Sequence, residues 1–231
     1  MAFRLLVNPD ILERFPNYRV AIIYASGLKN TASTEESTGW LREAERESRE
    51  RFGQDPLKEH PHIRLWQEAF SSFGAKPSKY PSSVEALLKR VVADKELPSI
   101  NALVDAYNAL SIKHVIPIGG EDRDRLLSDL ELRFMSGTET FDTVNAGQPV
   151  VENAAPGEVA WVDAGGVTCR RWNWRQCRRT ALTTDTVNAY FVLDHLAPYP
   201  EEALEAAAAE LESRILHLCP NAGVTREMLG R

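Results

Sequence analysis

Ten residues of the chain, Arg170–Arg179, concentrate side chains that recognise anions. The segment holds five arginines and two tryptophans and no acidic residue, although the whole chain has a formal net charge of -6. A guanidinium binds phosphate through a planar, permanently charged set of donors, and an indole offers a face for stacking. A positive segment on an acidic chain therefore predicts a local phosphate or nucleic-acid site. The alternative is a β-hairpin whose arginines are solvated or paired with neighbouring acids.

A second polar set lies on a helix predicted over residues 100–113. Asn101, Asp105 and Asn108 stand at positions i, i+4 and i+7, so a helix brings all three to one face. Asparagine and aspartate suit a helix interior poorly, because their side chains compete for nearby backbone groups. Their presence favours a structural role, in which they fix neighbouring loops by hydrogen bonds, over direct catalysis. A solvent-exposed face is the remaining alternative.

The cysteines and histidines give weaker signals. Cys177 lies among arginines, which can activate a thiol, but no histidine or aspartate stands at a spacing that would complete a nucleophilic site. A packing role for Cys177 is therefore favoured. The three cysteines form neither a disulfide framework nor a zinc pattern, and the five histidines show no ligand spacing. We accordingly expect no metal and no cofactor.

Composition limits the class of protein. A chain of 231 residues with 43% hydrophobic residues can bury one core, so a single domain over residues 1–231 is expected. No apolar run is long enough for a membrane span, and the first residues lack the apolar core and cleavage site of a signal peptide. We expect a cytoplasmic protein without membrane contact, and the sequence predicts no particular oligomeric state.

The elements that must position these residues mix strands and helices without regular alternation. Helices are predicted over residues 35–51, 84–92 and 100–113, and from Pro61 and Pro200 onward. Strands are predicted over 19–25, 130–134, 158–163, 167–171, 180–186 and 187–193, with a tight turn at Gly165-Gly166. Residues 142–157 are predicted to be turns, and Gly119-Gly120 a sharp turn or a close approach to a ligand. The fold class is predicted to be α+β.

Several motifs occur together in an order that resembles one family. They are Lys76-Pro-Ser-Lys-Tyr-Pro-Ser-Ser-Val84, Leu97-Pro-Ser-Ile-Asn-Ala-Leu-Val-Asp-Ala-Tyr-Asn108, Pro117-Ile-Gly-Gly120, Glu131-Leu-Arg133 with Gly137-Thr-Glu139, and Cys169-Arg-Arg-Trp-Asn-Trp-Arg-Gln176. This set is similar to the B3/B4 domain, the editing module of the phenylalanyl-tRNA synthetase β subunit, and the chain resembles free-standing relatives of that module. The resemblance covers about residues 70–196. A strand and helices in 1–69 are expected before it, and a helical segment in 197–231 after it.

The resemblance implies a mixed sheet with flanking helices and a central pocket. In the synthetase that pocket accepts the aminoacylated 3′ end of tRNA and removes mischarged tyrosine. Two positions depart from the synthetase pattern. Gly119 follows Ile116-Pro117-Ile118 where the synthetase has a histidine, and residues 172–176 contain no carboxylate where it has an acid after a Gly-Gly pair. The resemblance therefore implies a tRNA partner and a related pocket with altered chemistry.

The residues assigned to this pocket combine the resemblance with the needs of ester hydrolysis. Arg175 is expected to stabilise an oxyanion or hold a phosphate, Asn173 to orient water and Asp105 to receive the substrate's α-amino group, with Arg133 and Glu139 as alternatives for the first and third roles. The expected substrate-binding residues are Lys79, Asn101, Asn108, Gly119, Gly120, Arg133, Glu139, Trp174, Gln176 and Thr180. The expected RNA-binding residues are Arg170, Arg171, Arg178 and Arg179.

Two functions follow from this assignment. The favoured one is a stand-alone deacylase that binds tRNA and hydrolyses misacylated aminoacyl-tRNA. The alternative is a module that binds RNA, aminoacyl-tRNA or a free amino acid without turnover.

Overall fold

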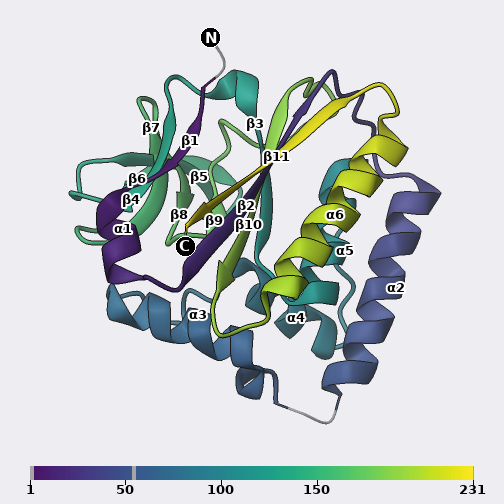
Figure 1. Cartoon of the computed structure of the whole chain (residues 1–231), viewed down its shortest axis with the longest axis horizontal. Coiled ribbons are helices and arrows are strands. Elements are labelled where there is room, and N and C mark those ends of the chain that lie inside the picture. The colour runs from purple at the N-terminus through teal and green to yellow at the C-terminus, as the bar shows by residue number, and fades with distance from the viewer. Residues whose placement is uncertain (1–2, 54–55, 231) are drawn as a thin grey trace.

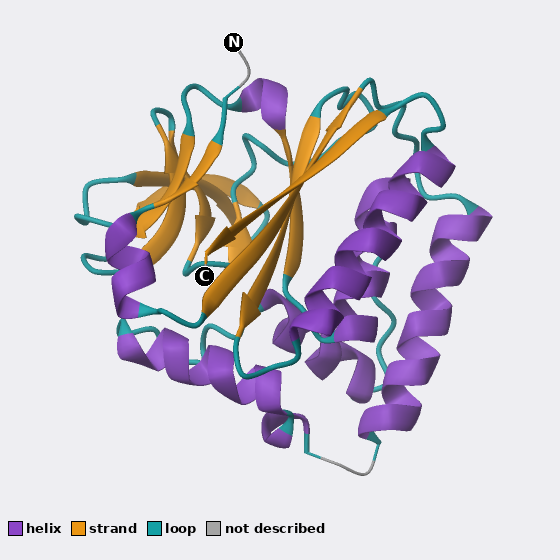
Figure 2. Ribbon diagram, viewed as in Figure 1, coloured by secondary structure: helices purple, strands orange, loops and turns teal. Residues whose placement is uncertain are grey.

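The computed structural model describes residues 3–53 and 56–230. Two sheets pack against each other, and helices cover the outer face of one of them (Figures 1 and 2). The α-helices are α1 (Pro9–Arg14), α2 (Glu35–Phe52), α3 (Pro61–Ser72), α4 (Ser83–Val92), α5 (Ala102–His114) and α6 (Glu201–Leu218), with 3-10 turns at Leu57–Glu59 and Arg123–Arg125. The predicted α+β class is confirmed. Among the described residues, no helix combines the length and apolar character needed to cross a bilayer.

One sheet has four antiparallel strands. Their order is β11 (Gly223–Gly230), β2 (Tyr18–Ser26), β10 (Ala189–Leu196) and β3 (Ile118–Asp122). The central strands β2 and β10 are apolar along most of their length because both of their faces are covered. Ile23 and Phe191 pack toward α5 and α6, whereas Ile22 and Tyr190 pack toward the second sheet. Figure 1 shows α6, α5 and α2 on one side of this sheet and the second sheet on the other.

The second sheet has five strands. Their order is β1 (Leu5–Val7), β4 (Leu130–Phe134), β7 (Val159–Asp163), β8 (Gly166–Arg170) and β9 (Arg175–Gln176). β1 runs parallel to β4, and the other pairings are antiparallel. β7 and β8 form the hairpin that the sequence predicts. A separate two-stranded ribbon, β5 (Thr140–Asn145) with β6 (Gln148–Asn153), lies beside β8.

Helices α2, α4 and α5 each begin at a side chain that caps them. Thr34 and Ser37 form a capping box at the start of α2, and the Ser82 hydroxyl accepts a hydrogen bond from the Glu85 amide at the start of α4. Asn101 caps α5 through the amide of Val104. The apolar faces of these helices share one cluster that includes Leu41, Leu88 and Ile112. This packing holds α2, α4 and α5 together, and α5 also contacts β3.

Three local predictions were wrong. The stretch 142–157 contains most of the β5–β6 ribbon. Of the two alternatives for Gly119-Gly120, the sharp turn is not found, because both glycines lie within β3. Residues 180–186 were predicted to form a strand but form a loop with turns. The Thr183 amide donates a hydrogen bond to the Thr186 hydroxyl and so closes the backbone locally. The segment after α6 adds strand β11 to the predicted helix.

Candidate functional site

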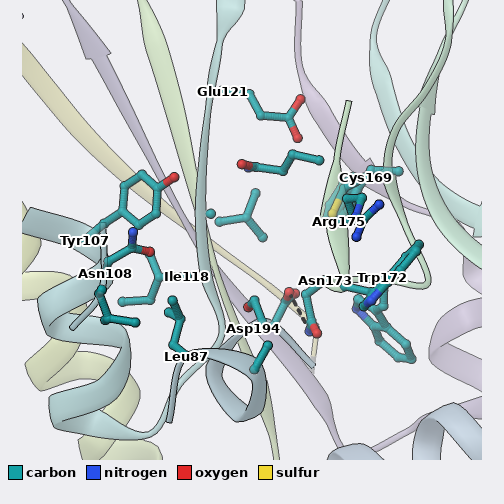
Figure 3. Close-up of a pocket in the computed structure, with 18 of the residues that line it drawn as sticks. Leu87, Tyr107, Asn108, Ile118, Glu121, Cys169, Trp172, Asn173, Arg175 and Asp194 are labelled. Carbon is teal, nitrogen blue, oxygen red and sulfur yellow. Dashed lines mark hydrogen bonds between the residues drawn. The ribbon is translucent and has the colours of Figure 1, made fainter. Parts of the chain in front are cut away.

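A cavity of about 300 Å³ lies between the two sheets, beside α4 and α5. Its apolar walls come from Leu87, Leu97, Pro98, Ile118, Trp161, Cys169, Trp172 and Val192. Its polar lining includes Ser83, Tyr107, Asn108, Glu121, Asn173, Arg175, Gln176, Tyr190 and Asp194. Figure 3 shows Tyr107 and Asn108 reaching in from one side and Asn173 and Arg175 from the other. Apolar walls with a few placed polar groups are typical of ligand pockets, so this cavity is the candidate site.

A turn with unusual backbone angles leads from β8 to this cavity. Arg171 and Trp172 both adopt the left-handed conformation, with φ of 46° and 66°, which is uncommon for residues other than glycine. The turn is fixed by a 2.7 Å hydrogen bond from the Trp172 amide to the Val159 carbonyl. The Trp172 ring is fully buried among other aromatic rings, with centroids 4.8 to 5.3 Å away. As a result, residues 173–176 run along the cavity wall.

Two of the arginines expected to bind RNA, Arg170 and Arg171, lie beside acidic residues. Arg170 is only 5% exposed, and its Nε and Nη2 donate to the two Glu158 carboxylate oxygens at 2.9 and 2.8 Å. Glu152 lies 2.9 Å from another nitrogen of Arg170, and Arg171 lies 3.7 Å from Glu158. Burial raises the pKa of Glu158, but hydrogen bonds from Arg170 and the charge of Arg171 outweigh it and hold that pKa below its ordinary value.

The remaining two arginines of this group differ from each other. Arg179 pairs with Asp163 at 2.6 Å, whereas Arg178 is exposed and forms no ion pair with any described residue. The four expected RNA-binding arginines therefore do not form one exposed surface. Three of the four, Arg170, Arg171 and Arg179, lie within 4 Å of an acidic side chain.

Cations and aromatic rings stack around Trp174, which lines the cavity. The Arg171 guanidinium lies 3.6 Å from the centroid of the Tyr80 ring and 4.6 Å from that of Trp174. Arg175 lies 4.5 Å from the Trp174 ring, and Lys79 lies 5.1 Å from the Tyr80 ring. Arg175 is exposed, lines the cavity and forms no ion pair within the described residues. It is therefore free to contact an anionic or polarised ligand.

Glu121 provides one of two carboxylates in the cavity lining. It follows Gly119-Gly120 on β3 and is 3% exposed. Its Oε2 accepts hydrogen bonds from the Tyr190 hydroxyl at 2.7 Å and from the Thr180 hydroxyl. Burial raises the pKa of Glu121, and these hydroxyl donors oppose the rise only in part.

The two glycines before Glu121 leave room for larger neighbours. A Cβ at Gly119 would lie 2.7 Å from the Gln176 side-chain nitrogen, and one at Gly120 would lie 2.6 Å from Phe191. The Gln176 amide donates to the Gly120 carbonyl at 3.2 Å. Glycine at these positions thus allows Gln176 to lie against β3 inside the cavity.

Asp194 on β10 is the second carboxylate. It is 2% exposed, and its two oxygens accept from the Tyr18 hydroxyl at 2.6 Å and from the Asn173 amide at 3.1 Å (Figure 3). Burial raises the pKa of Asp194 to about 6, against the opposing effect of these donors. The side-chain oxygen of Asn173, Oδ1, is buried without a hydrogen-bond partner in the described chain, whereas its backbone carbonyl accepts from the Ser83 amide at 3.1 Å. Asp194 therefore orients Asn173 and leaves its side-chain oxygen unpaired.

The three polar residues Asn101, Asp105 and Asn108, at the start of α5 and within it, lie in two different environments. Asp105 is fully buried and accepts from the Ser37 hydroxyl at 3.1 Å, while Asn101 donates to the Leu182 carbonyl at 3.1 Å. These two residues hold neighbouring segments, which is the structural role that the helix pattern favoured. Asn108 lines the cavity. Asp105 does not line it, because its carboxylate faces the start of α2, so the structure does not place Asp105 beside Arg175.

Arg133 and Glu139 lie outside the cavity lining as well. They form a 2.9 Å ion pair with each other. Glu139 also accepts from the amides of Ser136 and Gly137 at 3.0 and 3.1 Å. Although burial raises the pKa of Glu139, these bonds and Arg133 lower it to about 2. This pair organises the loop after β4.

Cys177 is 3% exposed, and its sulfur lies 3.1 Å from the Thr180 hydroxyl. Burial raises the pKa of the Cys177 thiol to about 11, so the thiolate needed for nucleophilic attack is scarce at neutral pH. Within residues 3–53 and 56–230, no three histidine, cysteine or acidic residues form a group that could hold a metal ion.

The sequence reasoning missed the carboxylates of the cavity. Asp194 is the one acidic residue in the apolar strand β10, and Glu121 follows two glycines at which a close ligand approach was predicted. An acid inside an apolar strand is a signal of a buried carboxylate, and such groups often mark functional sites. Residues 172–176 contain no carboxylate themselves, but strands distant in sequence supply two to the same cavity.

Comparison with known proteins gives one family match. Residues 65–214 match the family described as B3/4 domain. The chain is similar to a solved N-terminal fragment of the phenylalanyl-tRNA synthetase β subunit from Pyrococcus horikoshii, with a TM-score of 0.46 and 12% sequence identity. That similarity covers 99% of this chain and 55% of the fragment, so the chain spans about half the length of that structure. No curated protein matches the chain.

Proposed function

The chain belongs to the B3/4 domain family, and on that basis we propose that it binds the aminoacylated 3′ end of a tRNA and hydrolyses the ester of a misacylated tRNA. The tRNA partner rests on the resemblance of its motifs to the synthetase editing module. The chemistry rests on one observation. Arg175, an exposed cation with no ion pair among described residues, shares the cavity with Asn173, whose side-chain oxygen Oδ1 is buried and unpaired.

In this proposal the amino acid enters the cavity and its ester stays near the rim. The apolar walls enclose the side chain, and two exposed arginines that line the cavity, Arg90 and Arg175, are available to the terminal phosphate and ribose. Holding the ester in one orientation accounts for a large part of the barrier reduction in such reactions.

The hydrolytic step uses the pair of Asn173 and Asp194. A water molecule that enters beside Asn173 donates one hydrogen bond to its unpaired side-chain oxygen Oδ1 and attacks the carbonyl carbon of the ester. Asp194, the carboxylate bound to Asn173, accepts the proton and returns it to the departing ribose oxygen. Its pKa of about 6, raised by burial, suits a base that works near neutral pH. The carbonyl oxygen gains negative charge as the water attacks, and Arg175 stabilises that charge.

The test is single-turnover release of amino acids from a panel of misacylated tRNAs. Wild type is compared with Arg175→Gln and with a matched control, Arg178→Gln, which removes a second exposed and unpaired arginine of the same segment. Loss of an oxyanion donor typically slows turnover about a hundredfold to a thousandfold. We expect a loss of that size for Arg175→Gln and a much smaller change in its tRNA affinity. Because Arg178 lies outside the cavity lining, the control should keep the wild-type release rate at saturating protein, even where its tRNA affinity falls.

The same experiment separates hydrolysis from binding alone. A protein that only binds would show no release by wild type, and Arg175→Gln would alter affinity only. Release no faster than spontaneous deacylation across the panel would contradict the proposed activity.

A further inference from the structure

One oxygen of Glu121 has no partner in the described chain. Both hydroxyl donors, from Tyr190 and Thr180, bind its Oε2. No hydrogen bond of normal geometry reaches its Oε1 from the described residues, although the nearby Thr168 hydroxyl also lowers the pKa of Glu121. The residue is only 3% exposed and lines the cavity. Asp194 differs, because each of its oxygens accepts a hydrogen bond. Glu121 is thus the carboxylate with spare acceptor capacity inside the cavity.

Charge is distributed unequally along the cavity. The cationic side chains that line it, Arg90 and Arg175, are both exposed, whereas the carboxylates Glu121 and Asp194 are buried. Neither carboxylate forms an ion pair with a described residue. The mouth therefore attracts anionic or polarised groups, and the interior attracts cations.

A buried carboxylate without a cation is unfavourable when ionised. Ionised groups in protein interiors are normally paired, because desolvation is otherwise uncompensated. Burial correspondingly raises the pKa of Glu121. A cation delivered by a ligand would offset that desolvation, so the cavity favours a ligand that carries one.

We propose that the cavity binds an amino acid whose side chain ends in an alkylammonium group, and that Glu121 is the residue that binds this group. The apolar walls between the rim and Glu121 fit the methylene stem of such a side chain. This inference specifies the substrate class of the proposed function, and it rests on that function only for the attachment of the amino acid to tRNA.

An ammonium group fits the interior better than a neutral hydroxyl group. It carries three hydrogen-bond donors, whereas a hydroxyl carries one. Apart from the Asn173 side-chain oxygen, which the proposed function assigns to the attacking water, the cavity lining offers further acceptors that receive no hydrogen bond in the described chain. They include the free Glu121 oxygen and the side-chain oxygen of Gln176, whose nitrogen is bound to Gly120.

The test measures binding of amino-acid amides, which are not esters. Lysinamide and norleucinamide share the α-amino group and the four-carbon stem, so they differ in the terminal ammonium. By calorimetry we expect lysinamide to bind wild type at least about tenfold more tightly, as a charge-assisted hydrogen bond implies. Tyrosinamide serves as the neutral-hydroxyl probe and is expected to bind more weakly than lysinamide.

The matched variants are Glu121→Gln and Asp185→Asn. Each removes one negative charge, but Asp185 is exposed and lies outside the cavity lining. Glu121→Gln should abolish the preference for lysinamide and leave norleucinamide binding nearly unchanged, which also reports that the variant is folded. Asp185→Asn should keep the full preference.

Equal affinity of wild type for lysinamide and norleucinamide, tighter binding of tyrosinamide, or no binding of any amide would overturn the proposal. These results leave the proposed function intact if misacylated tRNAs with other side chains are hydrolysed. Conversely, selective lysinamide binding without hydrolysis of any tRNA would support the ligand class and contradict the hydrolytic function.

Discussion

Replacing Asp194 with asparagine tests the buried carboxylate that orients Asn173. Burial raises the pKa of Asp194 from 3.8 to about 6. Between these two values the folded protein holds a proton on Asp194 that the unfolded chain has released. Wild-type stability therefore falls as the pH rises through this window. One pKa unit corresponds to about 1.4 kcal/mol, so the whole shift corresponds to about 3 kcal/mol of unfolding free energy.

The Asp194→Asn variant has no proton to exchange at this position. The amide that replaces the carboxylate can accept from one of the two donors that bind Asp194, so we expect a pH-independent loss of about 1–3 kcal/mol from the unpaired donor. In addition to this pH-independent loss, the difference in unfolding free energy between wild type and variant should decrease by about 3 kcal/mol from roughly pH 4 to pH 6.

Urea unfolding of both proteins across this range provides the measurement. Subtracting the two free energies at each pH cancels the other titrating groups, because both proteins share them. A difference that does not change with pH would refute the raised pKa of Asp194. A difference that increases with pH would indicate a lowered pKa, which ion pairing rather than burial would produce.

Three further predictions concern single side chains. Replacing buried Arg170 with methionine should reduce stability by about 3–5 kcal/mol because its acids lose their partner, whereas the same change at exposed Arg178 should stay within about 0.5 kcal/mol in chemical denaturation. Asn101→Ala should reduce stability by about 0.5–2 kcal/mol, because α5 loses its helix cap. Asn108→Ala should change stability little and should weaken ligand binding, because Asn108 lines the cavity. Thermal unfolding of both variants with and without tRNA checks these expectations. Cys177→Ser should retain most activity, since burial raises the pKa of this thiol to about 11, and an acyl group trapped on Cys177 in mass spectrometry would contradict this.

The sequence predicted most helices because their signals are local. Ser82 caps α4 and Pro61 occupies the first turn of α3, and the apolar residues that follow keep helical spacing. The β5–β6 ribbon gave no such signal. Most of β6 is exposed, so its residues do not alternate between a buried and a solvent face.

The sequence identified several residues that line the cavity from their unusual types, but it did not identify which side chains pair with one another. Asn173, Trp174 and Arg175 were singled out by the composition of their segment, and all three line the cavity. Pairing of the other arginines with acids was one of the two alternatives, but the acids themselves were not identified, because Glu158 lies 12 residues before Arg170 and approaches it only through the β7–β8 hairpin. Burial of a carboxylate such as Glu121 likewise depends on strands that are distant in sequence.

Blocking the cavity tests most directly whether the reaction occurs there. Ala86 on α4 is exposed and lines the cavity, so a tryptophan at this position can fill the mouth without disturbing the core. Val92→Trp, an exposed position on the same helix outside the lining, is the control. In single-turnover release from misacylated tRNA, we predict wild-type rates for the control and the spontaneous rate for Ala86→Trp, with both variants folded. Equal release by Ala86→Trp and wild type, or no release by wild type, would contradict the assignment of the cavity as the catalytic site.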